Sequence, residues 1–170
     1  MKNSLKYILA ATLLVGSISL KAQNTLKIGH IDSQALIMAM PESDSATKKL
    51  EASRKQIQET LESLQVEFNQ KYQTYIDKQN TYTDLIRSAK ETELQDLNER
   101  IQQFQSNAQQ DLQKQQAQLF QPIQEKAKKN IDEVARENGF TYIFDSQAII
   151  YASDSSEDIL PLVKKKMGLK

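Results

Sequence analysis

The 170-residue chain contains no cysteine and no tryptophan, and only four glycines, three prolines and one histidine. Without cysteine it forms no disulfide and cannot carry a lipid on a cysteine, so its stability must come from packing or oligomerisation. A single histidine without cysteines does not supply a zinc site, and no Ser/His/Asp order or glycine-rich phosphate loop is present. We therefore expect no enzyme, no metal and no cofactor.

Residues 42–138 lack glycine altogether and contain one proline, Pro122, while apolar residues recur every three or four positions. This spacing predicts long helices that each carry one apolar face. Because the pattern advances about 3.6 residues per step, the helices should be nearly straight. The apolar positions are Ile57, Leu61, Leu64, Phe68, Tyr72, Tyr75, Tyr82 and Ile86 in the first half, and Leu94, Leu97, Ile101, Phe104, Ala108, Leu112, Leu119, Ile123, Ala127, Ile131 and Val134 in the second.

Runs of β-branched and aromatic residues flank the helical region at 26–32, 141–145 and 148–151, and they predict three short strands. Such strands bury enough surface only in one sheet, whereas a single rod of about 95 residues would separate them by more than about 100 Å. The helices should therefore form an antiparallel hairpin with its tip within 82–92. The predicted fold class is α+β, in which a long hairpin, residues 42–138, projects from a small β body. Residues 23–41 form the first part of the body, and residues 139–170, with a short helix after Ser156, form the rest.

The β body has fewer than about fifty residues, which is below the size that normally folds without disulfides or metals. We expect further copies of the chain to complete it. After Leu119 the apolar face turns away from the first helix, and Pro122 should kink the second helix there. We expect the base of this helix to pack against a neighbouring subunit. The alternative is that Ala127 and Ile131 cover the sheet of their own chain.

The N-terminus has the pattern of a cleaved signal peptide over residues 1–22, with Lys2 and Lys6 before an apolar run at 7–20. Cleavage is expected between Ala22 and Gln23. The apolar run is shorter than the roughly 20 residues of a spanning helix. The signal-peptide pattern therefore predicts an exported chain. Removing 1–22 leaves 19 basic against 22 acidic side chains, and this charge balance argues against a nucleic-acid partner.

Three polar residues near the predicted strands have structural roles in this interpretation. His30 lies within the first strand, without a second histidine or a cysteine to share a metal. Asp32 is placed to cap a short helix that Pro41 ends. Asp145 closes a strand at a turn, where its side chain can accept a hydrogen bond from the backbone.

Four segments carry a resemblance to a known family: residues 27–33 (KIGHIDS), 119–123 (LFQPI), 131–145 (IDEVARENGFTYIFD), and Tyr151 with the helix after Ile159. Together with the Gln/Glu/Lys-rich hairpin they resemble the Skp/OmpH family of periplasmic chaperones. The resemblance implies a homotrimer with a β-barrel body and three hairpins around a cavity. It also implies an ATP-independent holdase that keeps unfolded outer-membrane proteins from aggregating. The implied trimer body includes Ile28, Ile31, Tyr142, Ile143, Phe144, Ile149 and Ile150.

A holdase needs apolar side chains that the hairpin does not use for its own packing. At 100° per residue Ile76 and Leu85 flank the apolar face and Val66 lies almost opposite it, so the candidate client-binding residues are Val66, Tyr72, Ile76, Tyr82 and Leu85. Tyr75 is expected in the hairpin core, and for Ile76 and Leu85 the core alternative stays open.

Basic residues are not clustered at the predicted tip, which contains three basic and four acidic side chains. Strongly basic family members carry such clusters, so the sequence gives no basis for expecting lipopolysaccharide or membrane contact. The alternative function is a structural coiled-coil adaptor or spacer of the cell envelope, which would bind one folded partner. The tip residues are Asp77, Lys78, Asp84, Arg87, Lys90, Glu91 and Glu93.

Overall fold

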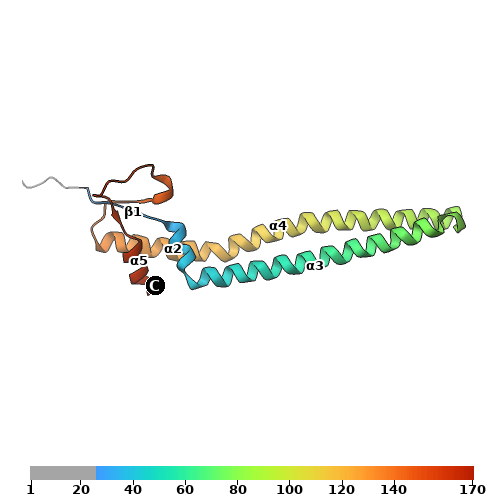
Figure 1. The fold of residues 1–170 in the computed structure, drawn as a ribbon, viewed down its shortest axis with the longest axis horizontal. Helices are drawn as coiled ribbons and strands as arrows, with labels where there is room; N and C mark the ends of the chain where they lie inside the picture. Colours follow the sequence, from blue (N-terminus) through green and yellow to red (C-terminus); the bar gives the residue numbers. More distant parts are fainter. Residues whose placement is uncertain (1–25) are drawn as a thin grey trace, which may run out of the picture.

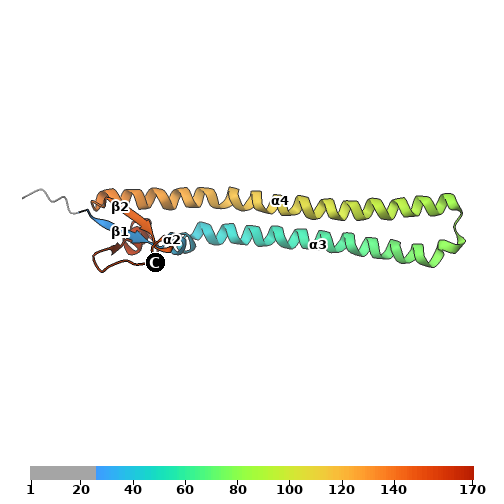
Figure 2. The same ribbon diagram turned by 90° about the horizontal axis from the view of Figure 1, so that it is seen from above.

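The computed structural model describes residues 26–170, so the predicted signal peptide and the cut between Ala22 and Gln23 lie outside the described residues. A helical hairpin projects from one end of a small body that holds the sheet (Figures 1 and 2). This arrangement confirms the predicted α+β class. The elements, in order, are β1 (Ile28–Ile31), α2 (Ser33–Ala39), α3 (Pro41–Lys78), the 3-10 turn η1 (Gln79–Thr81), α4 (Asp84–Glu137), β2 (Tyr142–Asp145), the 3-10 turn η2 (Ser146–Ala148), β3 (Glu157–Asp158) and α5 (Leu160–Met167).

Local sequence explains where the hairpin helices begin. Met40 is extended, with φ −80° and ψ 131°, because the residue before a proline avoids the helical region. Pro41 then occupies the first turn of α3, where its missing N–H costs nothing. At the other helix, the Thr83 side chain accepts a hydrogen bond from the Ile86 N–H and caps α4.

The tip lies at residues 79–83, so only its last two residues fall within the predicted range 82–92. The prediction was wrong because it placed the turn at the midpoint of two equal arms. In the structure α3 has 38 residues and α4 has 54, since the last turns of α4 continue past the start of α3 and pack on the body. The sequence did contain a local signal, because Thr83 followed by Asp84 is a typical helix start.

The sheet is parallel, with strand order β2-β1-β3. Ile28 lies opposite Tyr142 and His30 opposite Phe144. A Cβ on Gly29 would come within 2.9 Å of side-chain atoms of both Ile143 and Phe140. Glycine at this position therefore allows close packing on the inner side of the sheet.

The predicted strand at 148–151 is absent, and the third strand is formed by Glu157–Asp158 instead. Asp145 accepts a hydrogen bond from the Gln147 N–H and starts the η2 turn, which takes the chain off the sheet. The second edge of β1 is already paired with β3. Ile150 and Tyr151 follow this turn and are exposed, outside every strand of residues 26–170.

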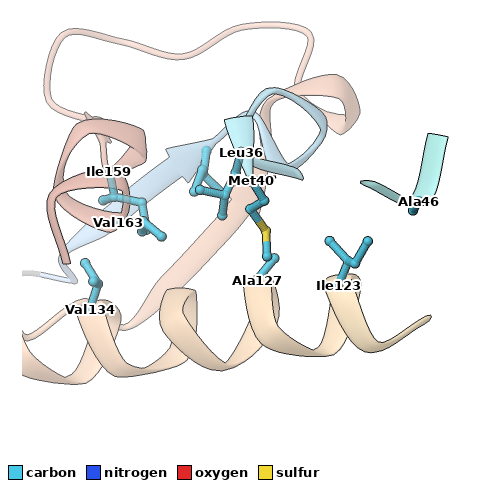
Figure 3. Packing of buried hydrophobic residues seen from close by; sticks show 9 residues of the cluster. Leu36, Met40, Ala46, Ile123, Ala127, Val134, Ile159 and Val163 are labelled. Atoms are coloured by element: carbon cyan, nitrogen blue, oxygen red, sulfur yellow. The ribbon is translucent and has the colours of Figure 1, made fainter. Parts of the chain in front are cut away.

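The body has a continuous apolar core built from all its helices and from β1 (Figure 3). Leu36, Met40, Ile159 and Val163 are fully buried. Ala127, only 3% exposed, packs in this core, and Ile131 packs against it. These two residues therefore follow the alternative, in which they cover the body of their own chain. The apolar face does turn after Leu119, but it turns toward the body of its own chain.

A second, smaller cluster holds the middle of the hairpin, where Leu64, Leu97 and Ile101 are buried. Leu61, Phe68 and Phe104 pack around them, as the apolar spacing predicted. Between the two clusters the contact is partly polar, since the Ser53 hydroxyl donates a 2.8 Å hydrogen bond to the Gln115 side chain. The α4 helix is continuous through Pro122. Over residues 26–170 no helix is long and apolar enough to cross a membrane.

Candidate functional site

Large apolar side chains that the fold leaves exposed fall into two main groups. The first, which we call the outer sheet face, consists of Leu26, Ile28, Tyr142, Phe144, Ile150 and Tyr151 on the body. The second, which we call the arm residues, consists of Val66, Tyr72, Ile76, Leu85 and Ile86 on the distal part of the hairpin.

Strand alternation produces the outer sheet face. Ile28 points away from the core while Ile31 is buried in it, because successive side chains of a strand point to opposite sides. The parallel register sets Tyr142 beside Ile28, and the Tyr142 and Phe144 rings lie 6.1 Å apart. Next to them is a hollow of about 670 Å³. The hollow is lined by Leu26, Ile28, Phe144, Ser155, Ser156 and residues 148–153.

The residues assigned to a trimer body therefore divide into two sets. Ile31 is buried in the core of its own chain, and Ile143 packs against that core. Ile28, Tyr142, Phe144 and Ile150 are exposed, and Ile149 is half-buried in the wall of the hollow. Only this second set is available to another molecule.

Polar residues around the sheet tie its segments together. Asp32 accepts a 2.8 Å hydrogen bond from the Ala35 N–H and caps α2, as predicted. The Ser33 hydroxyl donates to the Asp145 carboxylate, and this hydrogen bond lowers the pKa of Asp145. His30 Nδ1 lies 3.0 Å from the Ser156 hydroxyl. In the described part of the chain no cluster of His, Cys, Asp or Glu is suited to hold a metal.

The arm residues lie away from the buried contact between α3 and α4. Val66 is 49% exposed, Ile76 39% and Leu85 83%. Tyr72 is also exposed, although its ring stacks on Phe68 with 6.1 Å between centroids. These side chains contribute little to the packing of the hairpin itself.

Two residues next to the tip differ from the sequence interpretation. Tyr82, a candidate client-binding residue, is only half-exposed, because its ring lies 6.4 Å from that of Tyr75. Ile86 belongs to the apolar pattern of the hairpin but is 45% exposed. Its position in the first turn of α4, directly after the tip, explains the difference, since α3 has already ended there.

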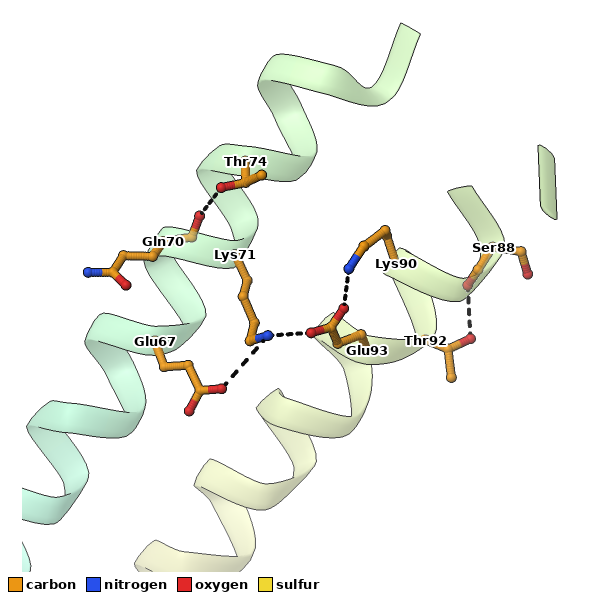
Figure 4. A network of polar contacts seen from close by, with 8 residues as sticks. All are labelled: Glu67, Gln70, Lys71, Thr74, Ser88, Lys90, Thr92 and Glu93. Carbon is orange, nitrogen blue, oxygen red and sulfur yellow. Dashed lines mark hydrogen bonds and ion pairs between the residues drawn. The ribbon is translucent and has the colours of Figure 1, made fainter. Parts of the chain in front are cut away.

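A polar network joins the two helices near the tip (Figure 4). The Lys71 ammonium contacts the Glu93 carboxylate across the hairpin, and Lys90 contacts the same carboxylate at 2.7 Å. Hydrogen bonds from Lys71 and then Lys90 lower the pKa of Glu93 to about 2. The Tyr75 hydroxyl donates to Glu91, which raises the pKa of Tyr75.

Comparison with known proteins agrees with this architecture. The family described as outer membrane protein (OmpH-like) matches residues 27–167. The crystal structure of a candidate outer membrane chaperone (OmpH-like) from Caulobacter crescentus CB15 is similar over 87% of this chain and 90% of that one, with a TM-score of 0.73. At 14% identity this similarity concerns the fold alone. Among curated proteins none matches this sequence. Because the family match spans the hairpin and both parts of the body, the chain belongs to the OmpH-like family.

Proposed function

We propose that this chain is an ATP-independent holdase of the periplasm, which binds unfolded outer-membrane proteins and prevents their aggregation on the way to the outer membrane. Membership of the OmpH-like family supports this function. The structurally similar protein from Caulobacter crescentus CB15 is named as a chaperone, which agrees with it. The signal-peptide pattern of residues 1–22 supports the location.

The observation that carries the proposal is the exposure of Val66, Ile76 and Leu85 on an arm whose own packing uses other residues. Such side chains offer apolar contact without collapsing onto each other, because the rigid helices hold them apart. Each contact is weak. Several arms acting on one unfolded chain would raise the overall affinity through effective concentration. The net charge of about −3 after cleavage leaves apolar contact as the main source of binding.

We propose further that three copies assemble through the outer sheet face. An exposed apolar patch with two aromatic rings and Ile150 in open solvent is typical of a surface that binds another protein. Assembly there would direct all three hairpins away from one shared body, since each hairpin leaves its body at one end (Figure 1). Ile28, Tyr142, Phe144, Ile149 and Ile150 are the proposed contacts.

Client generality distinguishes this function from an envelope adaptor. Several unrelated outer-membrane barrels would be unfolded in urea and diluted into buffer with or without the mature chain, residues 23–170, while light scattering records aggregation. We expect suppression for every barrel and no binding to the same barrels once folded in detergent. Binding to a single folded partner, without suppression, would favour the adaptor instead.

A further inference from the structure

We propose that the distal end of the hairpin, residues 70–95, is a clasp: the Lys71–Glu93 contact holds it closed, and its opening exposes a second binding surface for apolar segments of an unfolded polypeptide. This inference rests on the proposed holdase function. It adds a site inside the hairpin to the arm residues on its outside.

The apolar packing of the hairpin stops well before the tip. The cluster around Leu64, Leu97 and Ile101 is its last buried part. None of residues 65–96, all of which the structure describes, is buried. Beyond this cluster the two helices are therefore not held together by a hydrophobic core.

Near the tip, polar contacts and one aromatic pair join the two helices in place of a hydrophobic core. Lys71 reaches Glu93 on the opposite helix and also lies 3.9 Å from Glu67 on its own helix (Figure 4). Between the helices is a hollow of about 380 Å³. Its lining includes Tyr75, Tyr82 and Leu94 together with Lys71, Lys90 and Glu93. Aromatic, apolar and charged side chains thus line the same hollow.

Such a closure is weak by nature. The Lys71 and Glu93 side chains are 38% and 37% exposed, and ion pairs that water reaches stabilise proteins little and are screened by salt. Segments with few buried contacts open locally without unfolding the rest of a protein. The distal hairpin should therefore separate into two helices while the middle cluster and the body stay intact.

Opening would change what the arm offers to a client. The rings of Tyr75 and Tyr82 and the side chain of Leu94 would face an incoming chain, close to the outward-facing Ile76 and Leu85. Tyrosine rings beside carboxylates and ammonium groups suit segments in which apolar and polar residues alternate. The rings can contact the apolar residues, and the charged groups can contact the polar ones. The strands of an unfolded membrane barrel have this alternation.

Hydrogen exchange tests the clasp without any client. In Lys71→Met and Glu93→Gln variants we expect amides of 70–95 to exchange about two- to fivefold faster than in wild type, with amides of 97–104 unchanged. Lys55→Met is the matched control, because its contact with Glu59 lies within α3 and does not join the helices. Unchanged exchange at 70–95 in both tip variants would overturn the clasp.

Crosslinking tests whether opening serves binding. Because the chain has no cysteine, Lys71→Cys with Glu93→Cys introduces the only thiols, which a short bismaleimide can join. We expect the joined protein to bind an unfolded barrel several-fold more weakly than the same variant left unjoined. Lys55→Cys with Glu59→Cys, joined in the same way, should show no difference. Equal affinity of the joined and unjoined tip variants overturns the clasp and leaves the holdase proposal standing. The holdase proposal fails separately if the wild-type mature chain, residues 23–170, does not suppress aggregation of unfolded barrels.

Discussion

The body and the arm of this protein bury their apolar residues in different ways. In the body nine buried side chains from β1, three helices and the start of α3 form one core. In the arm the buried cluster between the two helices has only three side chains, Leu50 is buried apart from it, and residues 65–96 have no buried side chain. Loss of one body residue therefore affects packing between several segments, whereas loss of one arm residue affects a local contact. Stability is concentrated in the body, and adaptable surface in the arm.

The largest effect is expected in the body. Leu36→Ala removes a fully buried side chain and should lower the free energy of unfolding by about 2–5 kcal/mol. Met38→Ala, on the exposed side of the same helix, should change it by less than about 0.5 kcal/mol. Urea titration followed by circular dichroism measures both. Similar values for the two variants would contradict the core described for the body.

The next prediction concerns substitutions at two neighbouring residues of β2. Ile143→Asp places a carboxylate against the core of its own chain and should unfold the body. Phe144→Asp changes the outer sheet face and should leave the chain folded but prevent assembly. Light-scattering mass and circular dichroism on the same samples separate the two effects. A trimer that survives Phe144→Asp would exclude the outer sheet face as the assembly surface.

Sequence alone predicted what depends on local pattern. The helical hairpin follows from apolar spacing, β1 and β2 from β-branched and aromatic runs, and the α2 cap from Asp32. Strand β3 could not be found in this way, because Glu157 and Asp158 have no strand character and pair only where β1 has a free edge. The apolar segment 148–151 has that character, but the η2 turn takes the chain off the sheet before it. Pairing is decided by tertiary structure, which outweighs β-propensity.

The candidate site was predictable to a similar extent. Helical geometry placed Val66, Ile76 and Leu85 off the packed face, and all three are exposed. It could not indicate that Ile86 would lie beyond the end of α3, since that depends on the position of the tip. Nor could it show that Lys71 and Glu93 meet, because the pairing of the two helices is set by the unequal lengths of α3 and α4.

A smaller effect on stability, with a clear effect on function, is expected for the arm residues. Replacing Val66, Ile76 and Leu85 together by Gln should change stability by no more than about 0.5 kcal/mol per residue, because these side chains are exposed. Client affinity should fall through the loss of apolar area. Leu64→Gln, in the buried cluster, is the control that should lower the thermal midpoint. A triple variant that is stable and still protects clients fully would rule out these three residues as the binding surface.

The smallest effect concerns pH. The pKa of Glu93 is lowered from 4.5 to about 2, so its carboxylate stabilises the closed clasp above about pH 4.5 and loses this contribution as pH falls toward 2. Exchange rates at 70–95, corrected for intrinsic pH effects, should therefore differ between wild type and Glu93→Gln at pH 6 and converge near pH 2. A difference that stays constant over this range would show that the charge of Glu93 has no role.

Aggregation of an unfolded outer-membrane barrel in the presence of a variant that lacks residues 70–95 tests the central claim most directly. The deletion removes the tip with the last nine residues of α3 and the first twelve of α4, and a short glycine-containing turn closes it. We predict that the variant keeps the mass and thermal midpoint of the wild-type assembly but suppresses aggregation, followed by light scattering, much less well. Full suppression by the shortened protein would contradict the claim that the body assembles and the arm holds the client.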